Sequence, residues 1–158
     1  MSDSILPYIA GFLDGDGCIM LQLVYRHDYI FGYQIRASIV FYQKSNHKDF
    51  LEWLKGYLKY GYIRDRKDNI SEYTIVGHKD VESVLKLLQL HLRLKKEQAR
   101  LALEIIQDLR AIKKLTPEIL LQMSKKVDQF GKLNYSKKRK NTSVKVEEYL
   151  KAKELLSP

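Results

Sequence analysis

The spacing of apolar residues changes abruptly near residue 17, and this change limits the folds open to the chain. Between residues 5 and 13 the apolar positions follow the i, i+4, i+7, i+8 spacing of an amphipathic helix (Ile5, Ile9, Phe12, Leu13). We expect Gly15 and Gly17 to end this helix. Period-two alternation follows directly, over residues 18–25 and again over 33–43. The chain therefore opens with a helix and two strands.

The same order of elements then recurs. Helical spacing returns over residues 45–58, with Ser45 or Asn46 as the expected cap. Residues 61–77 predict a hairpin that turns at 67–69, and helices are expected over 80–92, 96–109, 116–130 and 143–156. The order predicts an α+β fold, αββαββα with a four-stranded antiparallel sheet and additional C-terminal helices. We expect one domain over residues 1–158, with the αββαββα core in 1–110 and the C-terminal helices in 111–158.

Composition narrows the class of partner. Lys and Arg number 28 against 19 Asp and Glu, a net charge of +9, which favours a polyanion, nucleic acid before membrane. Cys18 is the only cysteine, so no internal disulfide can form and a reducing compartment is expected. We find no apolar run of membrane-spanning length and no secretory or transit pattern at the N-terminus. We therefore expect no membrane partner and a protein that stays where it is made.

The first helix carries an unusual combination of small and acidic residues. Gly11 and Gly15 lie four residues apart, so one face of the helix permits close approach of another backbone. Asp14 and Asp16 lie near the helix C-terminus, where partial negative charge disfavours carboxylates. A divalent cation would compensate, since it takes carboxylate and carbonyl oxygens. A turn-forming Asp-Gly pair of structural origin is the alternative, and these residues alone leave both open.

The stretch "YIAGFLDGDG" resembles the motif of the LAGLIDADG homing endonucleases, through Ala10, Gly11, Asp14, Gly15, Asp16 and Gly17. The segments "YQKS", "GYIRDRKDNISEY", "LRLKKEQARLALEII", "KVDQFGKLN" and "SKKRKNTS" occur in the order typical of the single-motif, homodimeric branch, so the resemblance covers nearly the whole chain. It implies a homodimeric, intron-encoded endonuclease that hydrolyses both strands of DNA at a long pseudo-palindromic site. The dimer interface implied by the motif helix comprises Pro7, Tyr8, Ala10, Gly11 and Asp14.

The resemblance also implies an active site. Asp16 and the carbonyl of Gly15 would hold Mg²⁺; Mn²⁺ is expected to substitute, and Ca²⁺ to support binding without cleavage. Gln43 would organise water and Lys95 would lie at the scissile phosphate, although Lys96 is adjacent and could be confused with it. His47 stands where relatives carry arginine; it could donate to phosphate, or it could be a solvated residue of the first helical turn. Gln43 has a similar alternative as an exposed strand terminus.

A larger set of residues is expected to contact DNA. The polar face of the sheet would enter the major groove, and its residues are Gln22, Val24, Arg26, Gln34, Arg36, Ser38, Tyr42, Arg64, Arg66, Glu72 and Thr74. Segment 134–143 resembles a backbone-contacting segment, whose phosphate ligands would be Ser136, Lys137, Lys138, Arg139, Lys140, Thr142 and Ser143. The alternatives are ordinary solvent-facing strand residues and a solvated run of charge.

Two other functions are compatible with the sequence. The first is an intron RNA maturase, in which the same fold assists splicing and intron RNA is a partner. The second is a catalytically inactive DNA-binding protein, against which the intact Asp16, Gln43 and Lys95 argue. By resemblance, the chain is expected to be encoded and synthesised in an organelle, chloroplast or mitochondrion.

Overall fold

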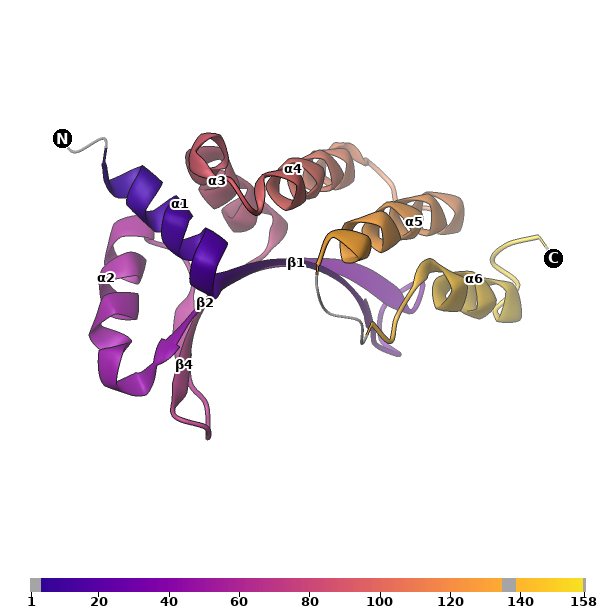
Figure 1. Ribbon diagram of the computed structural model, residues 1–158. Coiled ribbons are helices and arrows are strands. Elements are labelled where there is room, and N and C mark those ends of the chain that lie inside the picture. The colour runs from indigo at the N-terminus through magenta and orange to yellow at the C-terminus, as the bar shows by residue number, and fades with distance from the viewer. Residues whose placement is uncertain (1–3, 135–138, 158) are drawn as a thin grey trace. The chain divides into compact units, whose positions relative to one another are not determined.

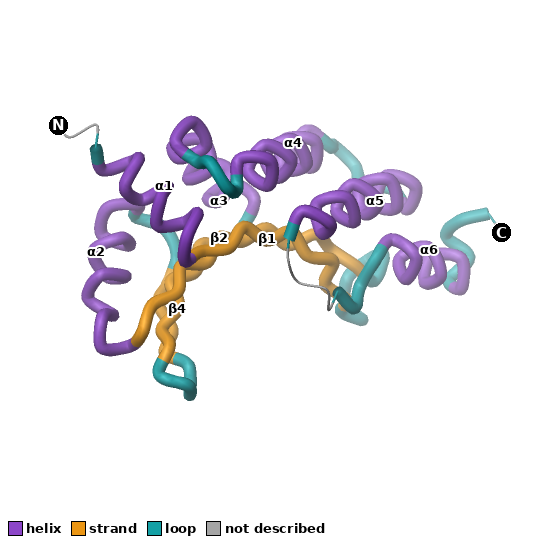
Figure 2. Tube along the Cα trace, in the orientation of Figure 1, coloured by secondary structure: helices purple, strands orange, loops and turns teal. Residues whose placement is uncertain are grey.

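The computed structural model describes residues 4–134 and 139–157 and confirms the predicted α+β fold (Figures 1 and 2). The sheet has four strands in the order β1-β2-β4-β3. The helices in the described residues are too short or too polar to cross a membrane. The elements are α1 (Ile5–Asp16), β1 (Gly17–Tyr25), β2 (Tyr33–Lys44), η1 (Ser45–His47), α2 (Lys48–Leu58), β3 (Tyr62–Asp65), β4 (Ile70–Val76), α3 (His78–Leu88), η2 (Gln89–His91), α4 (Lys96–Ala111), α5 (Pro117–Leu133) and α6 (Ser143–Ala152).

Several predicted helix boundaries are wrong. The helix expected over residues 80–92 ends at Leu88, and the 3₁₀ turn η2 follows it. Gly15 does not end α1, which continues to Asp16; the backbone becomes extended only at Gly17 (φ −125°, ψ 179°). Helix α2 begins at Lys48 after a 3₁₀ turn, so neither Ser45 nor Asn46 is its cap; the Ser45 hydroxyl instead hydrogen-bonds that of Ser71 at 2.9 Å. The last helix ends at residue 152 rather than 156.

The chain divides into two compact units. The first comprises residues 1–20 and 37–103, and the second comprises residues 21–36 and 104–158. Strands β1 and β2 contribute residues to both units, so the expected division at residue 110 does not coincide with this one. That the whole chain is one domain stays a prediction.

The core of the first unit forms on one face of the sheet. Phe41 on β2 pairs with Tyr73 on β4, and both side chains are fully buried. Phe12 of α1 stacks on Phe41 with ring centroids 5.9 Å apart, which places α1 over this face. The neighbouring pair in the ladder, Tyr42 and Glu72, points to the opposite face because side chains alternate along a strand. One face is therefore core and the other is polar.

The second unit is built around α5 and α6, which pack against each other (Figure 2). Thr116 caps α5 as predicted, since its hydroxyl accepts from the amide of Ile119 at 3.2 Å and Pro117 occupies the first turn. Tyr149 on α6 meets Tyr25 and Tyr33 with ring centroids 5.7 Å and 5.8 Å apart. These ring contacts hold α6 to the strand residues of this unit.

Candidate active site

The C-terminal end of α1 is bonded to the segment that precedes α4. One carboxylate oxygen of Asp14 accepts from the amide of Arg93 at 2.8 Å, and the other accepts from the amide of Lys95 at 3.0 Å. The Lys95 ammonium donates to the Asp14 carbonyl at 2.8 Å. A cation at the carbonyl end of a helix is favoured by the helix dipole. Asp14 therefore fixes the main chain and the side chain of Lys95 together.

This arrangement bears on two expectations. Both carboxylate oxygens of Asp14 accept hydrogen bonds within the chain, and its expected place at the dimer interface stays a prediction. Lys95 and Lys96 could not be separated by their sequence, yet they differ in the structure. Lys95 is half-buried and bonded to α1, whereas Lys96 is exposed as the first residue of α4. Of the two, Lys95 has a fixed position.

Asp16 is the last residue of α1, and it is exposed together with Gly15. Over residues 4–134 and 139–157, no hydrogen bond or ion pair engages its carboxylate. Nor do those residues contain a group of three His, Cys, Asp or Glu side chains that could hold a metal ion. One chain thus offers a carboxylate and nearby helix-end carbonyls, which is too few ligands for a hard cation unless a second chain or a substrate adds oxygens.

Cys18 adjoins this region and carried no signal in the sequence, because a lone cysteine within a strand resembles any small apolar residue. Burial raises the pKa of its thiol above 9.0, and the positive charge of Lys95 opposes this shift. The thiol is therefore protonated at neutral pH, and metals bind the thiolate form.

Gln43 and His47 lie beside a second polar cluster. Gln43 pairs with Ser71 in the ladder. Asp65 accepts from the Ser71 hydroxyl at 2.7 Å and from the Lys48 ammonium at 3.1 Å. The Ser71 hydrogen bond, and then that of Lys48, lowers the pKa of Asp65.

The hydrogen bond of the Gln43 side chain stays within its own segment. The side-chain oxygen of Gln43 accepts from the amide of Lys44 at 3.0 Å, and His47 is exposed at the N-cap of α2. No hydrogen bond joins either side chain to Asp16 or Lys95 in the described part of the chain. The structure thus brings Lys95 to the end of α1 directly, and it gives Gln43 and His47 no such bond.

The polar sheet face of the first unit is organised by Glu72. Its carboxylate is 14% exposed and pairs with Arg64 at 2.9 Å and with Arg66 at 3.4 Å. Tyr42 lies opposite Glu72 in the ladder. Two predicted DNA contacts on this face are wrong for the chain as folded, since Ser38 is only 3% exposed and Thr74 only 7% exposed.

The predicted DNA contacts of the second unit are mostly accessible. The exposed ones are Gln22, Arg26, Gln34 and Arg36, while Val24 is half-buried. Arg26 also pairs with Asp28 at 2.9 Å. These five stay predictions.

The basic segment is only partly available to a ligand. Ser136, Lys137 and Lys138 lie outside the described residues. Ser143 is buried, and both its amide and its hydroxyl donate to Asp128, so the expectation that it donates to phosphate is wrong for this state. The Arg139 guanidinium is half-buried and donates to the Leu21 carbonyl at 3.1 Å, whereas Lys140 is exposed and Thr142 is the N-cap of α6.

The predicted interface residues of α1 are divided by burial. Ala10 is 0% exposed, so its expected place in the interface is wrong; it packs inside the chain. Pro7, Tyr8 and Gly11 are exposed. A Cβ added at Gly11 or at Gly15 would meet nothing within 4 Å. Nothing within the single chain requires glycine at either position, although each glycine costs helix stability.

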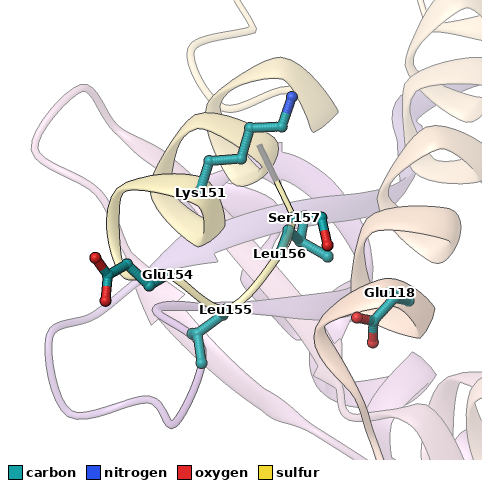
Figure 3. A pocket seen from close by; sticks show the side chains of 6 residues that line it. All are labelled: Glu118, Lys151, Glu154, Leu155, Leu156 and Ser157. Carbon is teal, nitrogen blue, oxygen red and sulfur yellow. The ribbon is translucent and has the colours of Figure 1, made fainter.

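A pocket near the C-terminus is unrelated to these residues (Figure 3). It has a volume of about 650 Å³ and is lined by Glu118, Lys151, Glu154, Leu155, Leu156 and Ser157. It belongs to the second unit and contains none of the predicted site residues.

An acidic helix end beside a fixed lysine, and a four-stranded antiparallel sheet with arginines on its polar face, are the features of an α+β nuclease domain. Residues 9–99 match the family model for the LAGLIDADG endonucleases. The chain belongs to the LAGLIDADG endonuclease family.

Two relatives resemble the chain over most of its length. DNA endonuclease I-CvuI of Chlorella vulgaris is 37% identical over 144 residues, 91% of this chain and 88% of the relative. DNA endonuclease I-CreI of Chlamydomonas reinhardtii is 39% identical over 138 residues, 87% of this chain and 83% of the relative. The crystal structure of I-CvuI with its target in the presence of 2 mM Ca matches with a TM-score of 0.90 and 35% identity over 96% of both chains.

Proposed function

We propose that the chain is a homodimeric, Mg²⁺-dependent DNA endonuclease that cuts both strands of a long pseudo-palindromic site and is encoded by an organellar intron. The observation that carries the proposal is the end of α1, where an exposed Asp16 carboxylate lies next to a Lys95 fixed by Asp14. Two relatives at 37% and 39% identity are DNA endonucleases by name, which supports the activity. The net charge of +9 suits a DNA substrate.

The donor set fits a magnesium ion shared with substrate. Mg²⁺ is usually held by one or two carboxylates together with phosphate oxygens rather than by a complete protein cage. Asp16 and the Gly15 carbonyl would hold the ion, and it would supply charge neutralisation and an acidified water at the phosphate. I-CvuI has been crystallised with DNA in 2 mM Ca and in 2 mM Mg, which supports divalent metal use. Substitution by Mn²⁺ is part of the proposal.

The protein residues have distinct tasks around the phosphate. The ammonium of Lys95, held at the helix end by Asp14, would stabilise the negative charge that develops on the phosphate oxygens. The Gln43 amide would orient the attacking water, for which it must leave its bond to the Lys44 amide. The exposed His47 imidazole would donate to a neighbouring phosphate.

The homodimer is supported by the surface of α1 and α2. The exposed Gly11 and Gly15 give α1 a face on which a second helix could approach closely. This face continues into exposed aromatic side chains, since Tyr8 (58% exposed) packs edge-on against Trp53 (44% exposed). Contact across a two-fold axis would bring two copies of Asp16 together and complete the metal ligands that one chain lacks.

DNA would be read by the polar sheet face. Glu72 holds Arg64 and Arg66 in fixed positions, and an ordered guanidinium can pair with guanine through two hydrogen bonds. Exposed Lys140 would bind phosphate without reading sequence.

A randomised duplex library tests the activity directly. The protein is incubated with the library and Mg²⁺, and cut ends are sequenced. We expect discrete cuts at one family of related, roughly palindromic sites. Binding without cuts would contradict the endonuclease and support a DNA-binding protein.

Asp14→Ala should slow cleavage by up to about a hundredfold, because small displacements of a catalytic group have effects of this size. The variant leaves two backbone amides without their acceptor, so stability should also fall by about 1–3 kcal/mol. Single-turnover cleavage and thermal unfolding measure the two effects.

Lys95→Met and Lys96→Met are the comparisons for Asp14→Ala. Because Asp14 is expected to act through Lys95, Asp14→Ala should add little to the rate loss of Lys95→Met. Lys96→Met removes an exposed lysine one residue away and should leave the rate nearly unchanged. If the rate losses of Asp14→Ala and Lys95→Met multiplied, the positioning role of Asp14 would be wrong.

A further inference from the structure

Two side chains of the basic segment bind the main chain of strand β1. Arg139 donates to the Leu21 carbonyl at 3.1 Å, and the Asn141 amide donates to the Leu23 carbonyl at 2.9 Å. We call Arg139 and Asn141 the edge-binding pair. Both acceptors belong to the same compact unit as the segment itself.

The acceptors explain the spacing of the pair. Strand β1 lies at one end of the sheet, so one of its sides has no neighbouring strand. Carbonyls two residues apart in a strand point to the same side, and Leu21 and Leu23 are two apart, as are Arg139 and Asn141. Side-chain donors thus satisfy two carbonyls at the edge of the sheet, where a further strand would otherwise pair.

Helix α5 is shaped to receive the Arg139 guanidinium. A Cβ added at Gly131 would collide with the Nη1 atom of Arg139, so the guanidinium would have to move from its present position if residue 131 had a side chain. The Arg139 Nε also donates to the Asn141 carbonyl at 3.3 Å, which ties the two members of the pair together. Burial lowers the pKa of Arg139, and the charge of Asp128 opposes this shift.

The segment is also held at its other end. Asp128 of α5 accepts from the amide and the hydroxyl of Ser143, the first residue of α6. Residues 139–143 are therefore bonded to β1 at two points and to α5 at a third. Lys140, between the two members of the pair, stays exposed.

We propose that Arg139 and Asn141 are positioning residues, which bind the sheet edge so that Lys140 is held in place for DNA phosphate, and that Arg139 is not itself a phosphate ligand. This proposal rests on the proposed function in so far as the ligand of Lys140 is DNA.

Binding to a short mixed-sequence duplex in Ca²⁺, measured over a range of salt concentrations, tests the assignment. Lys140→Ala should lower the slope of log K against log salt by about 1.8 for the dimer, about 0.9 for each of its two copies of Lys140. Arg139→Lys keeps the charge but cannot reproduce the forked hydrogen bonds to the Leu21 and Asn141 carbonyls. We therefore expect Arg139→Lys and Arg139→Ala to weaken binding alike, by about two- to tenfold.

The double variants separate positioning from contact. Lys140→Ala should change the affinity and the salt slope much less in the Arg139→Ala protein than in the parent protein, because Lys140 is no longer held in place there. If Arg139→Lys bound DNA like the parent protein while Arg139→Ala did not, Arg139 would be a phosphate ligand and the proposal would be overturned.

A DNA-free measurement distinguishes failure of this proposal from failure of the proposed function. Alanine is a better helix former than glycine, so if the space beside residue 131 were empty, Gly131→Ala would raise the melting temperature of the protein. Here it must displace the guanidinium, so we expect it to lower the melting temperature, by about 2–4 °C. In the Arg139→Ala protein the same change should be neutral or stabilising. Equal effects of Gly131→Ala in both proteins would overturn the proposal, whatever the DNA experiments show.

Discussion

Asp16→Asn should reduce DNA cleavage in Mg²⁺ by about a thousandfold or more, since a metal ion supplies several kcal/mol of charge stabilisation to such reactions. The carboxylate is exposed at the end of α1 and no side chain in the described residues replaces it as a ligand. Asparagine has nearly the size of aspartate but no charge, so the loss of cleavage rate reports on metal binding and not on a change in packing. Single-turnover cleavage of the selected site gives the rate.

The same variant should not be less stable than the parent protein. A carboxylate at a helix C-terminus is disfavoured by the helix dipole, and in the proposed dimer two copies of Asp16 repel each other in the absence of metal. We therefore expect the melting temperature of Asp16→Asn in metal-free buffer to be unchanged or higher. Loss of activity without loss of stability separates a metal ligand from a structural residue.

Two controls complete the experiment on Asp16. Asp49→Asn removes another acidic residue, an exposed one in the first turn of α2, and should cut DNA like the parent protein. Added Ca²⁺ should tighten DNA binding by the parent and not by Asp16→Asn, because only the parent retains the ligand. A variant that still cut the site in Mg²⁺ would remove Asp16 from the proposed mechanism.

The order of helices and strands was predictable because each element carries its own apolar period. The hairpin turn and the Thr116-Pro117 start of α5 are likewise set by residues next to one another in the chain. The start of α2 is not set locally, because the Ser45 hydroxyl hydrogen-bonds that of Ser71, a residue that is distant in sequence and lies in the sheet. Local capping signals fail where a tertiary hydrogen bond takes the capping group.

Strand alternation predicts the face of a residue but not its exposure. Ser38 and Thr74 lie on the polar face as the period requires, yet both are buried. Ala10 shows the same limit in a helix, since it is small enough for an interface but points into the core. Burial depends on what packs above a position, and the period of one element does not contain that information.

The roles of Asp14 and Arg139 could not be derived from the sequence for a different reason. Asp14 accepts from amides of residues 79 and 81 positions away, and Arg139 donates to a carbonyl 118 positions away. Backbone amides and carbonyls are the same for every residue type, so no side-chain pattern marks these partners. The sequence therefore led us to assign Asp14 to the dimer interface and Arg139 to phosphate, although the structure engages both with the protein's own backbone.

Gly11→Leu should convert the protein to a folded monomer and abolish double-strand cleavage. The Cβ position of Gly11 is open within the chain, so leucine meets no clash there and, as the better helix former, should stabilise α1 by up to about 1 kcal/mol. Across the proposed two-fold axis the same side chain would push the two α1 helices apart at their closest approach, since small residues permit that contact. Sedimentation equilibrium measures the mass, and circular dichroism confirms the fold.

Lys86→Leu is the control, because Lys86 is an exposed residue of α3, another helix of the same unit. It introduces the same side chain outside the surface of α1 and α2, so the dimer mass and the cleavage should remain. Gly11→Ala adds a single methyl group and should weaken the dimer less than leucine does. If Gly11→Leu sedimented as a dimer and cut both strands, the two copies of Asp16 would not meet through α1, and the shared metal ligands would have to come from another surface.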